Sequence, residues 1–223
     1  MGFLEAAVVI YLRRLYYPEG FEFPMVPMGE AVLVTEPLRE IATIVMLLSV
    51  GGMLARSALE RFAWFIFSFG VWDLVYYLGL WGVLGWPSSL STWDVLFLLP
   101  IPWFGPVYAP VLVAVGLILL AIILLSARRR NPSFQVLSRE WGLMIGGAAI
   151  IILSFVLDHA QYVLQDHSFW ALFAFSQEKL METSGDYVPR HFDLRIYAGG
   201  LLITLLGIAS VLRRSGLLEK DLS

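Results

Sequence analysis

The chain has 223 residues, of which 59% are hydrophobic and 15% are charged, whereas a soluble domain is about 45–50% apolar and about 25% charged. The net charge of −3 and the lack of a basic stripe argue against nucleic acid as a partner, and the lack of cysteine excludes disulfides and thiolate sites. The apolar residues lie in blocks long enough to cross a bilayer, so we expect an all-α integral membrane protein.

The first 29 residues are expected to lie outside the membrane-spanning bundle. Residues 3–17 predict a helix of about 22 Å, which is short for a span. Glu5, Arg13 and Arg14 within it favour an N-terminal amphipathic helix at the membrane interface. The arginines follow the apolar run, which is the reverse of a signal peptide. Residues 18–29 contain three prolines and two glycines, so they predict an ordered loop.

Residues 30–214 are expected to form a bundle of about five transmembrane helices. The first begins at Glu30, or at Glu36 with Thr35 as its cap and Pro37 in its first turn, and ends at Leu54. The other four are predicted at about Ala58–Gly85, Val107–Ser126, Trp141–Val163 and Leu194–Leu212. Residues 215–223 are expected to form a cytoplasmic tail.

Two connecting segments are rich in proline or aromatic residues. Residues 95–110 are apolar, but their four prolines forbid a continuous helix. Irregular backbone at membrane depth needs protein or water to satisfy its amides, so we expect a re-entrant or interfacial segment, or else a loop among the headgroups. Residues 165–192 predict a polar and aromatic loop, whose part at 168–177 is expected to lie on the membrane surface. Asp94 and Asp193 are expected to be solvated.

Orientation is predicted from the basic residues of the short loops. Nine of them fall between the first and second spans, between the third and fourth, and after the fifth: Arg56, Arg61, Arg128, Arg129, Arg130, Arg139, Arg213, Arg214 and Lys220. Such residues stay in the cytoplasm. We therefore expect the N-terminus outside and the C-terminus cytoplasmic, in a membrane of the bacterial inner type, with the lipid bilayer as the first partner.

Asp73 is an acid within the predicted second span, in the stretch FAWFIFSFGVWDLVYY. An ionised group at the centre of a span costs about 2.5–3.5 kcal/mol, so it is tolerated where it faces the bundle and finds a partner. Tyr76 and Tyr77 follow at i+3 and i+4 and can donate hydrogen bonds on the same face. We expect a proton site, metal ligand or ligand anchor, or alternatively a structural helix–helix hydrogen bond.

Two further pairs of ionisable residues fall in the outer half of the predicted spans. Asp158 and His159 lie near the end of the fourth span, where Asp158 shares a face with Tyr162 and the imidazole suits a metal or an acid; the alternative is an interface histidine. Glu36 and Glu40 share one face of the first span and could share a metal ion or a proton. The alternative is that they complement the helix dipole, with Arg39 neutralising one.

These residues converge on one site if the spans pack around one axis. Asp73 and Asp158 are then the candidate catalytic residues. The candidate metal ligands are Glu36, Glu40, Asp73, Asp158 and His159, supported by Arg39, Tyr76, Tyr77 and Tyr162. Oxygen ligands with one imidazole suit manganese, iron or zinc.

Three functions are compatible with this arrangement. The leading hypothesis is a membrane protein with a buried carboxylate and histidine site, with metal-binding or enzymatic activity. The second is an accessory subunit that binds other membrane subunits through its aromatic outer loops. The third is a proton-coupled transporter of small solutes in which Asp73 titrates.

Overall fold

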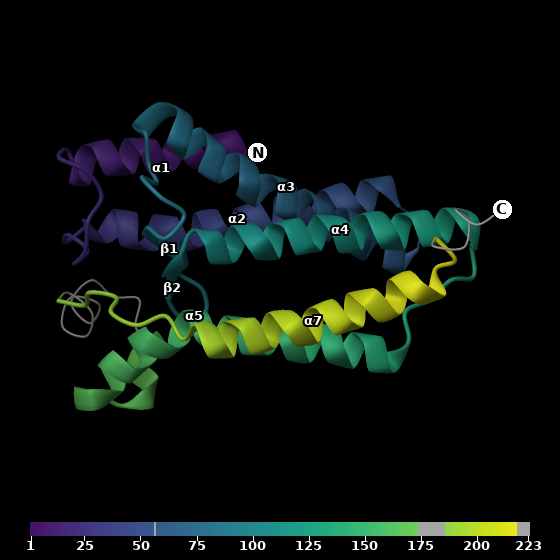
Figure 1. Cartoon of the computed structure of the whole chain (residues 1–223). Coiled ribbons are helices and arrows are strands. Elements are labelled where there is room, and N and C mark those ends of the chain that lie inside the picture. The colour runs from purple at the N-terminus through teal and green to yellow at the C-terminus, as the bar shows by residue number, and fades with distance from the viewer. Residues whose placement is uncertain (56, 174–185, 218–223) are drawn as a thin grey trace. The chain divides into compact units, whose positions relative to one another are not determined.

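The computed structural model describes residues 1–55, 57–173 and 186–217, and most of them are helical (Figure 1). The helices are α1 (Gly2–Tyr16), α2 (Glu30–Leu54), α3 (Ala58–Leu84), α4 (Tyr108–Arg130), α5 (Ser138–Asp166) and α7 (Leu194–Arg214), with a short 3-10 helix η1 (Phe169–Phe173). Part of the predicted surface segment at 168–177, most of the tail at 215–223, and Arg56 and Lys220 lie outside the described residues.

Four of these helices, α3, α4, α5 and α7, are long and apolar enough to cross a membrane, which is compatible with a multi-pass membrane protein. Each begins and ends within a few residues of its predicted span. The first predicted span, on α2, and the interfacial position of α1 stay predictions. α2 begins at Glu30 and contains Pro37, so the alternative start at Glu36 is wrong. The Thr35 hydroxyl donates to the carbonyl of Ala31 instead of capping a helix.

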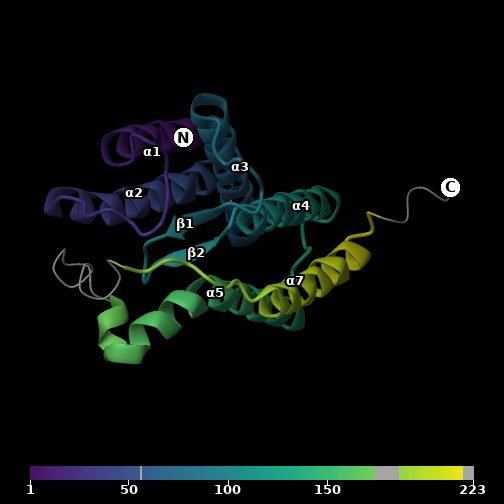
Figure 2. The ribbon, with the colours of Figure 1, turned by 60° about the vertical axis from the view of Figure 1, so that its left-hand side comes forward.

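The proline-rich segment forms a two-stranded antiparallel hairpin of β1 (Trp93–Phe97) and β2 (Trp103–Pro106), seen in Figure 2. The prolines exclude a helix, as predicted, and strand pairing supplies hydrogen-bond partners for the backbone amides. Trp93 pairs with Pro106 and Asp94 with Gly105. The fold is therefore mainly helical, and the all-α prediction did not include this hairpin.

The chain divides into two compact units, which are described separately. The first unit comprises residues 1–44, 75–110 and 154–192. It contains α1, the hairpin and parts of α2, α3 and α5. The apolar residues Ala6 and Ile10 of α1 pack with Leu80 of α3. The backbones of α1 and α3 approach closely there, because a side chain at Gly79 would lie 2.7 Å from the Cβ of Ala6.

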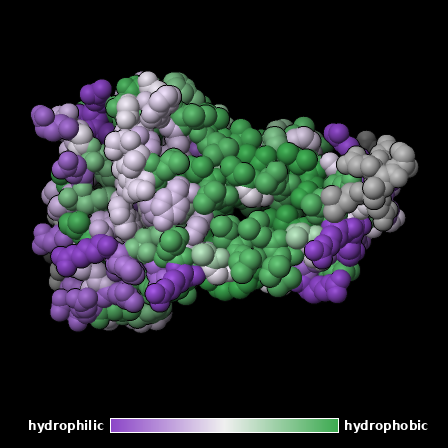
Figure 3. Space-filling model, in the orientation of Figure 1, coloured by the Kyte–Doolittle hydropathy of each residue, from purple (hydrophilic) through white to green (hydrophobic). Residues whose placement is uncertain are grey.

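The second unit comprises residues 45–74, 111–153 and 193–223, of which residues 56 and 218–223 are not described. Its core is apolar and includes Ala63, Ile66, Leu120, Leu124, Met144 and Val211. α5 and α7 lie side by side in both ribbon views (Figures 1 and 2), with Gly147 facing Gly200. The surface over α4 and α7 is hydrophobic along most of their length (Figure 3).

Candidate functional site

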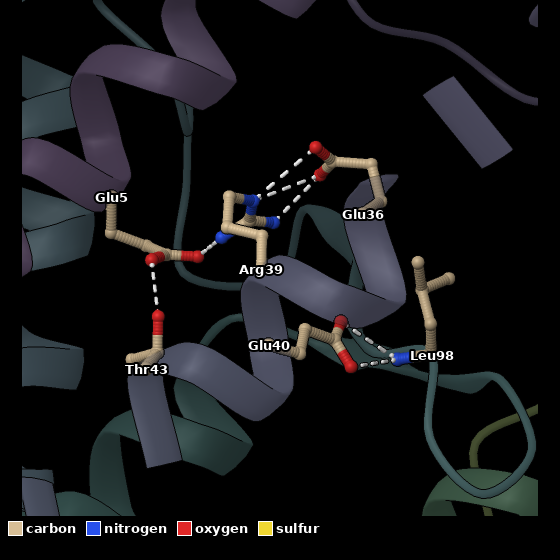
Figure 4. Close-up of polar contacts among 6 residues, drawn as sticks. All are labelled: Glu5, Glu36, Arg39, Glu40, Thr43 and Leu98. Carbon is tan, nitrogen blue, oxygen red and sulfur yellow. Dashed lines mark hydrogen bonds and ion pairs between the residues drawn. The ribbon is translucent and has the colours of Figure 1, made fainter. Parts of the chain in front are cut away.

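A cluster of charged side chains in the first unit is centred on Arg39 of α2 (Figure 4). Nη2 of Arg39 lies 2.7 Å from Oε2 of Glu36, and its Nε donates to the same carboxylate. Arg39 also forms an ion pair with Glu5 of α1. The side chains of Arg39, Glu5 and Glu36 are 20%, 11% and 13% exposed, so the cluster is largely shielded from water. We call Glu5, Glu36, Arg39 and Glu40 the Arg39 cluster.

Glu40 lies one turn beyond Glu36 but has a different partner. Its two carboxylate oxygens accept the backbone N–H of Leu98 at 2.9 and 3.1 Å, which ties α2 to the end of the hairpin strand β1 (Figure 4). Glu36 and Glu40 remain close enough for their charges to interact. Glu5 gains a further donor, the hydroxyl of Thr43 at 3.1 Å. The Arg39 cluster therefore holds three carboxylates and one guanidinium, which pairs directly with Glu5 and Glu36 and acts on Glu40 through its charge alone.

A second ion pair in the first unit joins Arg13 of α1 to Asp94 of β1. Nη2 of Arg13 lies 2.9 Å from Oδ1 of Asp94, and the hydroxyl of Tyr77 donates to Oδ2 at 3.2 Å. The guanidinium also lies 3.6 Å from the ring centroid of Trp86 and 4.4 Å from that of Phe21. This network holds α1, α3 and the hairpin together.

The prediction that Asp94 is solvated is wrong, because the residue is 1% exposed. Burial raises the pKa of the Asp94 carboxyl, while the charge of Arg13 and the hydrogen bond from Tyr77 oppose that rise. The partner of Asp94 lies 81 positions away in the chain. Nothing in the sequence around Asp94 indicates that partner.

Asp158 and His159 lie in α5 beside Tyr187, a residue that sequence reasoning missed. The hydroxyl of Tyr187 donates to Oδ2 of Asp158 at 2.8 Å, and the backbone N–H of Arg190 donates to the same oxygen at 3.1 Å. The ring of Tyr162 packs on Tyr187 with centroids 5.2 Å apart. Burial, and then Asp158, raise the pKa of the Tyr187 hydroxyl, so it stays a donor.

His159 is 2% exposed and packs between aromatic rings. Its ring centroid lies 5.1 Å from that of Phe104 in β2 and 4.9 Å from that of Tyr187. Asp158 thus points to a loop while its neighbour is enclosed by rings. This agrees with the expectation that adjacent helical residues face different directions.

Asp73 is buried and belongs to the second unit, whereas the other candidate residues belong to the first. Its convergence with them stays a prediction. Tyr76 lies close enough to Arg39 for an electrostatic interaction and packs on the ring of Tyr77 at 5.0 Å. Within the described residues, no group of three or more histidines or acids could hold a metal ion. The predicted manganese, iron or zinc site therefore has no support from the geometry.

A buried acid of the second unit, Glu140, was not predicted as a site residue. It is 0% exposed and accepts from Nε and Nη2 of Arg214, each at 2.8 Å. The hydroxyl of Ser210 and the N–H of Leu137 also donate to its carboxylate. Glu140 stands in the first turn of α5 and Arg214 in the last turn of α7. This network is a clamp between two helix ends, and it joins α5 to α7.

The chain was compared with known proteins at the level of sequence and structure. No protein-family model matches it, and no curated protein or solved structure matches it either.

Proposed function

We propose that the protein is a multi-pass membrane protein in which the Arg39 cluster binds and releases a proton. In this proposal α2 is a span in addition to α3, α4, α5 and α7, and the N-terminus lies outside the cytoplasm. The charge imbalance of the cluster is the observation that carries the proposal. The guanidinium of Arg39 is ion-paired with two carboxylates, those of Glu5 and Glu36, and these three side chains are each no more than 20% exposed. The carboxylate of Glu40 is a third negative charge, close enough to interact with the charges of Arg39 and Glu36.

Charged side chains that are shielded from water raise the free energy of the folded protein. If all three carboxylates are ionised, the cluster carries two uncompensated negative charges. Burial of charge is costly unless each charge is paired, and two neighbouring carboxylates do not both ionise readily. A bound proton removes one of these charges without any movement of the helices.

We infer the location of the proton from the charges beside each carboxylate. Arg39 pairs with both Glu5 and Glu36, and the Thr43 hydroxyl adds a donor to Glu5 alone; such donors stabilise an ionised carboxylate. Glu36 and Glu40 stand one turn apart, and their charges repel. We infer that these two residues share the proton.

A difference titration tests the proposal. Purified protein in an uncharged detergent is titrated with acid, and the curve of a Glu36→Gln, Glu40→Gln double variant is subtracted from that of wild type. Proton uptake near neutral pH in the difference curve supports the proposal. The control is Glu19→Gln, Glu30→Gln, which removes two exposed acids of the same unit. Identical curves for both pairs would contradict the proposal.

The accessory-subunit hypothesis is favoured by a separate observation. Phe169, Trp170 and Phe173 of η1 are 56%, 78% and 40% exposed. Large exposed aromatic side chains are typical of binding surfaces or membrane interfaces. Purification from the native membrane in mild detergent tests this hypothesis, since a lone monomer would count against it.

A further inference from the structure

The second unit carries a concentration of arginines where four of its helix ends meet. Contacts between side chains establish this meeting. Arg128 of α4 lies 3.5 Å from Glu60 of α3, and Arg214 of α7 is bound to Glu140 of α5. Nη1 of Arg130 also donates to the carbonyl of Gly216, just beyond α7, at 2.7 Å. The start of α3, the end of α4, the start of α5 and the end of α7 therefore lie together. We call this region the arginine end.

The described residues of the arginine end carry far more positive than negative charge. Its arginines are Arg61, Arg128, Arg129, Arg130, Arg139, Arg213 and Arg214, and its acids are Glu60 and Glu140. Both acids form ion pairs, Glu60 with Arg128 and Glu140 with Arg214. Among the described residues of the arginine end, no further acid is left to neutralise the remaining arginines.

Three of the remaining arginines are exposed and have no partner within the part of the chain that the structure describes. Arg61 and Arg130 donate to backbone carbonyls. Arg129, Arg139 and Arg213 are exposed, and no hydrogen bond or ion pair joins their side chains to other described residues. They stand on three different helices, at the end of α4, the start of α5 and the end of α7. Their backbones are fixed by the helices and by the Glu140 clamp, while their guanidinium groups are unpaired.

The position of these arginines identifies the ligand. α4, α5 and α7 are apolar enough to cross a membrane. α4 and α7 have arginines in their last turns, and the hydrophobic surface over α7 ends in hydrophilic residues at its C-terminal end (Figure 3). The ends of spans lie at the level of the lipid headgroups. A guanidinium group binds phosphate oxygens through paired, charge-assisted hydrogen bonds, and basic side chains near the surface attract anionic lipids.

We propose that Arg129, Arg139 and Arg213 form a binding site for the phosphodiester headgroup of anionic phospholipids. The proposal divides the arginines of this region into two groups. Four arginines hold the protein together, Arg128 and Arg214 through ion pairs and Arg61 and Arg130 through hydrogen bonds to backbone carbonyls. The other three bind lipid. The site is independent of the proton site proposed for the first unit.

Native mass spectrometry of the full chain tests the proposal. The protein is released from micelles that contain equal amounts of phosphatidylglycerol and phosphatidylcholine, and the bound lipids are counted. Wild type is expected to retain phosphatidylglycerol in preference. Because each basic residue contributes substantially to the attraction of anionic lipid, an Arg129→Gln, Arg139→Gln, Arg213→Gln variant should lose about tenfold or more of that preference.

The matched control removes the same charge elsewhere. Arg14→Gln, Arg190→Gln, Arg195→Gln replaces three exposed arginines of other regions and should keep the preference. Equal loss in both triple variants would show a bulk charge effect and overturn the proposal, as would an unchanged preference in the first. Displacement of phosphatidylglycerol by inorganic phosphate, but not by chloride at equal ionic strength, would reassign the site to a free anion and also overturn it. Circular dichroism shows whether each variant is folded.

Discussion

The buried pair of Arg13 and Asp94 gives a quantitative test of what holds the first unit together. Asp94→Asn preserves the size of the side chain but removes the charge that lies 2.9 Å from the guanidinium of Arg13. Loss of one partner of a buried pair costs about 3–5 kcal/mol, whereas an exposed pair contributes about 0–1 kcal/mol. The two side chains are 8% and 2% exposed, so the first range applies. We expect the free energy of unfolding to fall by about 3–5 kcal/mol.

The assay is reversible unfolding in mixed micelles, followed by circular dichroism, on three variants. Arg13→Met alone should also be destabilising, since it leaves the Asp94 carboxylate without its cation. The double variant Arg13→Met, Asp94→Leu removes both charges and keeps an apolar side chain beside Trp86 and Phe21. It should lie within about 2 kcal/mol of wild type, because apolar replacement of a buried pair is often tolerated. A loss below about 1 kcal/mol for Asp94→Asn, or a double variant as unstable as the sum of the single variants, would refute the reasoning.

Three further predictions concern other contacts. Gly147→Ala should lower the free energy of unfolding by about 1–3 kcal/mol, because the new Cβ would lie 2.7 Å from a backbone oxygen of α7. A Cβ at Gly146 would have no atom within 4 Å, so Gly146→Ala should be neutral or mildly stabilising. Equal effects of the two variants on thermal unfolding would count against the close packing of α5 on α7. Folding raises the pKa of the Tyr187 hydroxyl from 10.0, so its contribution to the free energy of unfolding is complete below pH 10 and is lost as the pH rises further. Tyr187→Phe should therefore make the free energy of unfolding less dependent on pH above pH 10. An unchanged pH dependence would contradict the burial of the hydroxyl. Glu140→Leu should cost about 1–3 kcal/mol, less than Asp94→Asn because Arg214 stays 33% exposed; an unaffected unfolding midpoint would show that the clamp contributes nothing.

The long helices could be predicted from sequence because their signals are local. Apolar length identifies a span, and glycine, proline and arginine mark its ends. The prediction for the second span, Ala58–Gly85, differs by one residue from α3, which ends at Leu84. The start of α2 was harder to predict. Proline is favoured in the first turn of a helix, which suggested a start at Glu36, but α2 begins at Glu30 and Pro37 lies inside it.

The hairpin could not be predicted in the same way. The prolines of residues 95–110 exclude a helix, but they do not indicate which strands pair. The register of Trp93 with Pro106 and Asp94 with Gly105 depends on contacts across the hairpin and on packing by α1 and α5. Burial of Asp94 likewise depends on Arg13, which lies in a different helix.

The sequence predicted the charged residues of α2 that belong to the candidate site, but not the residues from other elements that contact them. Glu36 and Arg39 do interact, and Glu40 is held in the same region. The contributions of Glu5 in α1 and of the Leu98 amide come from segments distant in sequence. A helical spacing shows which residues share a face, but it does not show which other element covers that face.

The infrared spectrum of the carboxyl groups at neutral pH shows directly whether Glu36 and Glu40 hold a proton. A protonated carboxylic acid has a C=O stretch that is distinct from the bands of an ionised carboxylate. If the Arg39 cluster holds a proton, wild type shows the band of a protonated carboxyl group. The Glu36→Gln, Glu40→Gln double variant loses that band, and Glu19→Gln, Glu30→Gln keeps it. A wild-type spectrum without that band at neutral pH, or a band that persists in the Glu36→Gln, Glu40→Gln variant, would contradict the proposed proton site.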